Sequence, residues 1–219
     1  MEKKAIVAML LIVVAAFAVS LYFYPQLPER MATHWNERGE VNGHMSKLWG
    51  SFLLPIMLLG LVGLFLVLPK IDPLKRNYPA FKRYYYGVVA LVLVFMLYIH
   101  IVSLVANMGF AFNMSYIILF PLALLFFFLG LVLPKVKRNW FMGIRTPWTL
   151  SSESVWAKTH KLGGWLFVAY GFFLMVMLLF YDLVVGYFTW IIMVPILSLV
   201  GFTFVYSYYE YWKENGKKK

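Results

Sequence analysis

Long apolar runs alternate with short polar segments along the whole chain. Six runs are apolar enough to cross a bilayer as α-helices, each close to the roughly 20 residues that a span requires. They cover 5–24, 51–68, 85–106, 114–133, 163–181 and 187–208. Ala16-Phe17-Ala18 resembles a signal-peptide cleavage site, but the apolar run continues beyond it, so we expect an uncleaved anchor. The pattern predicts an all-α integral membrane protein, a bundle of about six transmembrane helices.

Composition supports this prediction. Of the 219 residues, 63% are hydrophobic and 13% are charged, whereas a soluble domain is about half apolar and a quarter charged. The absence of cysteine excludes disulfides, thiolate catalysis and cysteine-ligated zinc. The net charge of +11 comes from residues that flank the apolar runs, as in membrane topology signals. We therefore expect no direct nucleic-acid binding.

The basic residues also predict an orientation. Of the 20 lysines and arginines, 17 lie at the two termini and in the second and fourth connections, and three lie in the first connection, at Arg30, Arg38 and Lys47. Short cytoplasmic loops carry the excess of lysine and arginine. The split predicts a multi-pass protein of the cell membrane with both termini in the cytoplasm.

The chain divides into two predicted regions. Residues 1–84 hold two spans, a small extracytoplasmic loop domain (25–50) and a basic cytoplasmic loop, and residues 85–219 hold four spans and the cytoplasmic loop 135–162. In the loop domain we expect a strand over 31–35 and a turn at Asn42-Gly43, with Gly39 and Gly43 free to adopt positive φ.

Three histidines are candidates for chemistry. His34 and His44, with Glu37 and Glu40 nearby, are weak zinc candidates, since their spacing matches no recognised metal motif. Their imidazoles could equally cap turns or lie near lipid headgroups. His100 lies inside the third span, where an ionisable residue is a functional hypothesis by default, but a satisfied or interfacial histidine is the favoured interpretation. We predict no metal and no cofactor.

The cytoplasmic loop predicts a helix on the membrane surface. Over 152–162, Val155, Trp156, Thr159 and Leu162 share one face and the lysines lie off it, which is typical of an interfacial helix. Arg145 precedes this helix in an apolar stretch and is expected to grip a carboxylate, helix-end carbonyls or a lipid phosphate. We predict that Arg145 anchors the surface helix to the bundle, and a purely structural clamp stays equally open.

These two loops resemble the SdpI family. The run 28–47, with His34-Trp35-Asn36, two glycines and a final Ser-Lys, resembles that family's extracytoplasmic domain of unknown function. The run 143–151, followed by Val-Trp, Thr-His and Leu-Gly-Gly, resembles its second signature. With the six spans, the resemblance covers nearly the whole chain. The candidate ligand- or partner-binding residues are His34, Trp35, Asn36, Asn42, Gly43, Lys47, Arg145, Thr146, Pro147, Trp148, Trp156 and His160.

The resemblance implies immunity to a secreted killing peptide, with sequestration of a transcriptional repressor at the membrane. The implied partners are membrane lipids, an extracellular peptide toxin and a cytoplasmic repressor. Two other function classes stay open. A transporter or permease needs polar groups at the midplane, and few are present. An enzyme needs a nucleophile with a base, or an open metal site, and neither is evident, so we predict no enzyme activity.

Overall fold

Six helices of the computed structural model, which describes residues 2–216, are long and apolar enough to cross a membrane. The prediction of an all-α membrane protein is therefore confirmed, with one small sheet added. The α-helices and strands are α1 (Glu2–Phe23), β1 (Arg30–Trp35), β2 (Val41–Ser46), α2 (Lys47–Ile71), α3 (Tyr78–Asn107), α4 (Met114–Val132), α5 (Pro147–Ser151), α6 (Glu153–Leu179), α7 (Tyr181–Val184) and α8 (Phe188–Gly216). Short 3-10 helices connect them at Tyr24–Gln26, Lys75–Asn77, Leu133–Lys135 and Val185–Tyr187.

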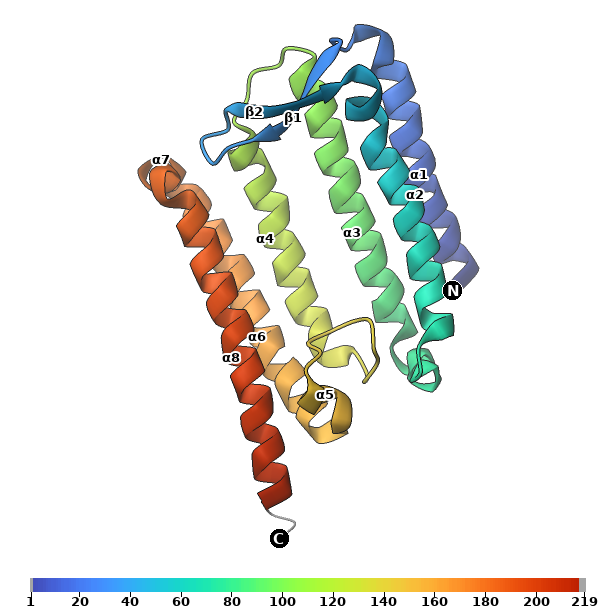
Figure 1. Ribbon diagram of the computed structural model, residues 1–219, viewed down its shortest axis with the longest axis vertical. Coiled ribbons are helices and arrows are strands. Elements are labelled where there is room, and N and C mark those ends of the chain that lie inside the picture. Colours follow the sequence, from blue (N-terminus) through green and yellow to red (C-terminus); the bar gives the residue numbers. More distant parts are fainter. Residues whose placement is uncertain (1, 217–219) are drawn as a thin grey trace.

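The helices stand side by side with α4 between two groups (Figure 1). On one side lie α1, α2 and α3, and on the other lie α6 and α8. The antiparallel β1–β2 hairpin crosses one end of the bundle, which we call the hairpin end. Helix α1 begins and helix α8 finishes at the opposite end, which also carries α5 and most of the described lysines and arginines. We call this the basic end.

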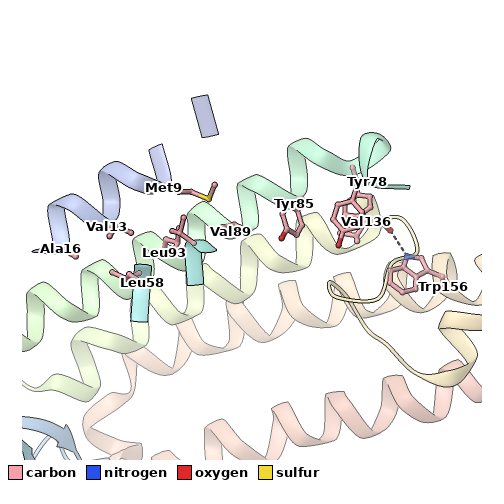
Figure 2. Close-up of a cluster of buried hydrophobic side chains, with 12 residues drawn as sticks. Met9, Val13, Ala16, Leu58, Tyr78, Tyr85, Val89, Leu93, Val136 and Trp156 are labelled. Carbon is pink, nitrogen blue, oxygen red and sulfur yellow. Dashed lines mark hydrogen bonds between the residues drawn. The ribbon is translucent and has the colours of Figure 1, made fainter. Parts of the chain in front are cut away.

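A buried cluster joins the first three helices to the basic end. Met9 and Val13 of α1 pack with Leu58 of α2 and with residues of α3. The cluster continues along α3 to Tyr78 and reaches Trp156, which comes from α6 (Figure 2). One continuous apolar core therefore connects the first helices to the second half of the chain.

Glycines allow α4 and α6, the most extensively paired helices, to approach closely. A Cβ on Gly130 would lie 2.6 Å from the carbonyl oxygen of Gly164, and one on Gly171 would lie 2.7 Å from that of Ala123. Small residues permit such backbone contact in membranes, where packing rather than the hydrophobic effect drives helix association.

Gly171→Val should force α4 and α6 apart. Overpacking of this kind costs about 1–3 kcal/mol, so the midpoint of thermal unfolding in detergent should fall clearly below that of the unmodified protein. Gly201→Val in α8 is the matched control, because nothing lies within 4 Å of a Cβ at Gly201. Equal midpoints for the two variants would mean that the glycine contact is unimportant.

The separate surface helix predicted over 152–162 is wrong. This segment is the first part of α6, which runs without interruption from Glu153 to Leu179. The predicted face is nevertheless the inward one, since Val155, Trp156 and Thr159 are buried. They pack against protein rather than lipid because the preceding loop folds over them. An amphipathic pattern alone does not distinguish these two environments.

Candidate functional site

The hairpin turn lies at Asn36–Glu40 and not at Asn42-Gly43. Asn36 Oδ1 accepts hydrogen bonds from the backbone N–H groups of Arg38 and Glu40 at 3.0 and 2.9 Å. Gly39 supplies the positive φ, 79°, that the turn requires. Asn42 and Gly43 belong to β2, and Gly43 does not have positive φ. The predicted strand over 31–35 is confirmed as part of β1.

Gly43 is required for a different reason, which is close approach to β1. It pairs with His34, and a Cβ at Gly43 would lie 2.8 Å from the His34 Cβ. Nδ1 of His34 lies 2.5 Å from Oδ1 of Asn42, so this imidazole is held by the neighbouring strand. Residues 2–216 contain no group of three or more His, Cys, Asp or Glu residues that could hold a metal ion. His44 pairs with Ala32 in the same hairpin.

Hydrogen bonds fasten the hairpin to both halves of the bundle. Near its base, the Asn107 side chain of α3 exchanges two bonds with the backbone of Ala32, at 2.7 and 2.9 Å. At its tip, Ser115 of α4 donates to the Asn36 carbonyl at 2.9 Å. The Tyr181 hydroxyl lies 3.0 Å from Oδ1 of Asn113, and Asn113 Nδ2 donates to the Arg38 carbonyl. The hairpin therefore bridges α3 to α4 and α7.

A cavity of about 430 Å³ lies beneath the hairpin tip. We call it the hairpin pocket. Its wall is mainly apolar and comes from α3, α4 and α8, while β1 and the turn provide a polar rim. The lining residues are Thr33, His34, Trp35, Asn36, Glu37, Ile99, Met114, Ser115, Ile118, Leu119, Leu122, Phe188, Thr189, Ile192 and Met193. An apolar cavity with a few convergent polar groups is the usual form of a ligand site.

Gly39→Ala should lift the hairpin tip from α4. An added Cβ would lie 2.7 Å from Asn113 Oδ1, the atom that Tyr181 also contacts. A cysteine introduced at Met114, which is 2% exposed and lines the pocket, should then react faster with a thiol reagent. Gly109→Ala is the control, because Gly109 also has positive φ, 94°, but has open space around it. Equal reactivity in both variants would show that the contact between Gly39 and Asn113 does not hold the hairpin tip on α4.

The predicted candidate His100 supports the hairpin from below. It is fully buried, and its Nε2 lies 2.7 Å from Ser20 Oγ, which also donates to the Ser51 carbonyl at 2.7 Å. Ser51 in turn donates to the sulfur of Met31 in β1. Through Nε2 the histidine joins α1, α2 and α3, but its buried Nδ1 has no hydrogen-bond partner within residues 2–216, so the favoured interpretation of a satisfied histidine holds for one ring nitrogen only.

Lys47 lies apart from the hairpin pocket. It is the first residue of α2, and its Nζ lies 3.6 Å from a Glu29 carboxylate oxygen and 4.9 Å from the Tyr24 ring centroid. Of the predicted hairpin candidates, His34, Trp35 and Asn36 line the pocket. Asn42 and Gly43 act behind them by holding His34.

At the basic end, Asn139 organises the loop that precedes α5. It is fully buried, and its Oδ1 accepts from the N–H groups of Phe141 and Met142 at 2.9 and 2.6 Å. Its Nδ2 donates to the carbonyls of Lys137 and Met142. Asp72, after α2, accepts from the Trp140 N–H at 2.9 Å. The loop is therefore built around one asparagine and tied to the first half of the chain by one aspartate.

Trp156 and His160 hold the loop against α6. The indole N–H of Trp156 donates to the Val136 carbonyl at 2.8 Å (Figure 2). Nε2 of His160 accepts from the Ile144 N–H at 3.0 Å, so its Nδ1 carries the proton and donates to the Trp156 carbonyl at 2.8 Å. The two rings stack with centroids 3.9 Å apart. We call Trp156 and His160 the clasp.

The predicted role of Arg145 is wrong. Its guanidinium is exposed and donates to the Trp140 carbonyl at 2.7 Å, within its own loop. It therefore closes the loop on itself and does not anchor the following helix to the bundle. The clasp performs that anchoring, because aromatic rings fill the buried space and their polar atoms match the loop backbone.

The second signature also attaches to α8. The Thr146 hydroxyl lies 2.9 Å from that of Ser207, and the Trp148 ring packs on Phe204 and Tyr208. Pro147 begins α5 directly after the Thr146 cap. Two further contacts join α6 and its cap to α8, namely Lys158 with Glu210 at 2.6 Å and Ser152 with Glu214 at 2.7 Å.

The candidate residues thus form two separate groups, one at each end of the bundle (Figure 1). Sequence reasoning missed Asn113, Ser115 and Tyr181 at the hairpin end and Asp72 and Asn139 at the basic end. Asn113 just before an apolar run is a capping signal, and its side chain does accept from Tyr116 N–H. The other contacts join residues distant in sequence and carry no local signal.

Comparisons with known proteins match both regions. The model of the SdpI/YfhL protein family matches residues 135–207, and a domain of unknown function, DUF1648, matches residues 11–59. The chain is 26% identical over 216 residues to "Immunity protein SdpI" of Bacillus subtilis (strain 168), covering 99% of this chain and 100% of that protein. No solved structure matches the chain significantly. The two matched regions, in this order and within full-length similarity, show that the chain is a multi-pass membrane protein similar to the SdpI/YfhL family.

Proposed function

We propose that this immunity-type membrane protein captures an extracellular peptide or envelope ligand in the hairpin pocket and thereby protects the cell. The pocket is apolar inside and polar at its rim, which suits an amphipathic ligand. The similarity to a protein named for immunity supports the protective role. In this proposal the hairpin end is extracytoplasmic and both termini are cytoplasmic, as the distribution of basic residues predicts.

Helix α8 supports a link between the two ends of the bundle, because it contacts both candidate sites. Helix α8 lines the hairpin pocket with Phe188 and Thr189, and the same helix meets the second signature through Ser207 and Glu210. Because α8 is one helix, a ligand that displaces its first turns strains its contacts with the loop at the other end. A cytoplasmic partner such as a repressor would bind differently once these contacts at the basic end have changed.

The orientation gives a direct prediction. Single cysteines are easily interpreted because the chain has none. In intact cells, a membrane-impermeant thiol reagent should label a cysteine at Glu37, in the exposed hairpin turn, and should not label one at Pro147 until the cells are opened. The reverse pattern would place the hairpin in the cytoplasm and remove the basis for capture of an extracellular ligand.

The protective role is tested by expressing this chain in place of its relative. In Bacillus subtilis lacking Immunity protein SdpI, expression of this chain should restore growth in spent medium from strain 168. An empty vector is the negative control, and the relative itself is the positive control. Death of cells that hold abundant membrane-inserted chain would contradict the protective role.

A further inference from the structure

A second, polar cavity of about 530 Å³ opens at the basic end. It lies between the start of α3, the exit of α4 and the start of α6, and we call it the basic pocket. Arg76, Lys137 and Arg138 line it, with Glu153 as the one lining carboxylate. Three cations against one anion favour a negatively charged occupant.

Arg138 presents an unused donor in the wall of this pocket. Its Nη1 donates to the Leu150 carbonyl at 3.0 Å, which fixes the guanidinium plane. Its Nη2 lies 3.7 Å from a carboxylate oxygen of Glu153, whose side chain is 76% exposed, so this ion pair is weak. Within residues 2–216 the buried Nε has no hydrogen-bond partner. A buried donor left unpaired in a native protein calls for a missing acceptor.

The edge of the guanidinium that carries this unpaired Nε indicates which acceptor would fit. Nε and Nη2 form the edge of arginine that binds two oxygens of a planar carboxylate or of a phosphate. The first turn of α6, at Glu153 and Ser154, lies in the same wall, and the start of a long helix favours an anion.

The position of the pocket along the membrane helices indicates whether the phosphate belongs to a lipid or to a free ion. Ala80 lies in the first turn of α3, and Pro134 lies two residues after the end of α4. The pocket therefore lies where the membrane helices end, which is the level of the lipid headgroups. Basic pockets between helices at the cytoplasmic side bind anionic headgroups.

We infer that the basic pocket binds the phosphate of an anionic phospholipid. Phosphate is the shared chemistry of a lipid headgroup and a free phosphate ion, and the depth of the pocket assigns it to the lipid. A zwitterionic headgroup carries its own cation into the positive pocket and is disfavoured. This inference rests on the proposed cytoplasmic placement of the basic end, but not on ligand capture at the hairpin end.

The test compares probes on the purified full chain in a neutral detergent. Dioctanoyl phosphatidylglycerol should bind, measured by calorimetry, and should remain attached in native mass spectrometry. Dioctanoyl phosphatidylcholine and inorganic phosphate should each bind at least about tenfold more weakly. Equal binding of inorganic phosphate would overturn the assignment to a lipid, and absence of phosphatidylglycerol binding would overturn the site.

Charge-matched variants locate the site. Arg76→Gln with Lys137→Gln removes two lining cations, both exposed, and leaves Arg138 and its bond to Leu150 in place. Affinity for phosphatidylglycerol should fall about tenfold. The control, Lys135→Gln with Lys161→Gln, removes two exposed cations outside the pocket and should change affinity less than about twofold. Equal losses in the two double variants would show that only the overall charge attracts lipid.

Discussion

Ile118→Trp should abolish protection while leaving the protein inserted and abundant. Ile118 lies in α4 and lines the hairpin pocket without being fully buried, so the larger indole can occupy the cavity with little cost to the helix core. A filled pocket cannot hold the ligand. In the replacement assay, the tolerated dose of spent medium should fall at least about tenfold, which corresponds to roughly 1.4 kcal/mol of lost binding.

The control for this prediction uses the same substitution on a surface facing away from any cavity. Ile56→Trp in α2 replaces a residue that is 48% exposed and lines none of the described pockets. This variant should protect as well as the unmodified chain. Full protection by Ile118→Trp would show that the ligand acts elsewhere.

Asn139→Leu should unfold the loop before α5, with the largest stability effect of any single side chain at the basic end. Leucine has the same branched arrangement of heavy atoms, although it is bulkier, and it removes all four hydrogen bonds that Asn139 makes with the loop backbone. Each buried backbone group left without a partner costs about 1–3 kcal/mol. The midpoint of thermal unfolding should fall, and a cysteine reporter at Met142 should become reactive.

Asn42→Leu is the control, because it makes the same substitution at an asparagine that is not buried. Asn42 is exposed, and its side chain contacts His34 at the surface of the hairpin. Its replacement should change the free energy of unfolding by less than about 0.5 kcal/mol. If both variants unfold at the same temperature as the unmodified protein, the basic-end loop does not depend on Asn139.

Hydropathy was sufficient to find all six spans, because a lipid environment demands long apolar helices. It placed the start of the fifth span ten residues after the start of α6, since the first turns of α6 bury one face and leave polar residues exposed on the other. The division of the chain at residue 84 stays a prediction.

The predicted hairpin turn at Asn42-Gly43 was wrong because strand pairing, rather than the local Asn-Gly signal, determines where the chain turns. Asn-Gly usually marks a two-residue turn, but Asn36 binds the turn backbone and Gly43 is needed opposite His34. Similarly, the partner of Asn113 is Tyr181, which lies 68 residues away, and no local pattern reveals that contact. Sequence could therefore name the loops that matter but not the atoms that hold them.

Photo-crosslinking tests the central proposal, ligand capture in the hairpin pocket, most directly. A photoreactive benzoylphenylalanine would replace Thr189, which lines the pocket, or its neighbour Trp190, which is 68% exposed and does not line it. Cells of the replacement strain would be irradiated in spent medium, and the chain would be analysed by mass spectrometry. We predict an adduct from the medium at position 189 and none at position 190. Full protection with no adduct at position 189, or equal adducts at both positions, would contradict capture in the pocket.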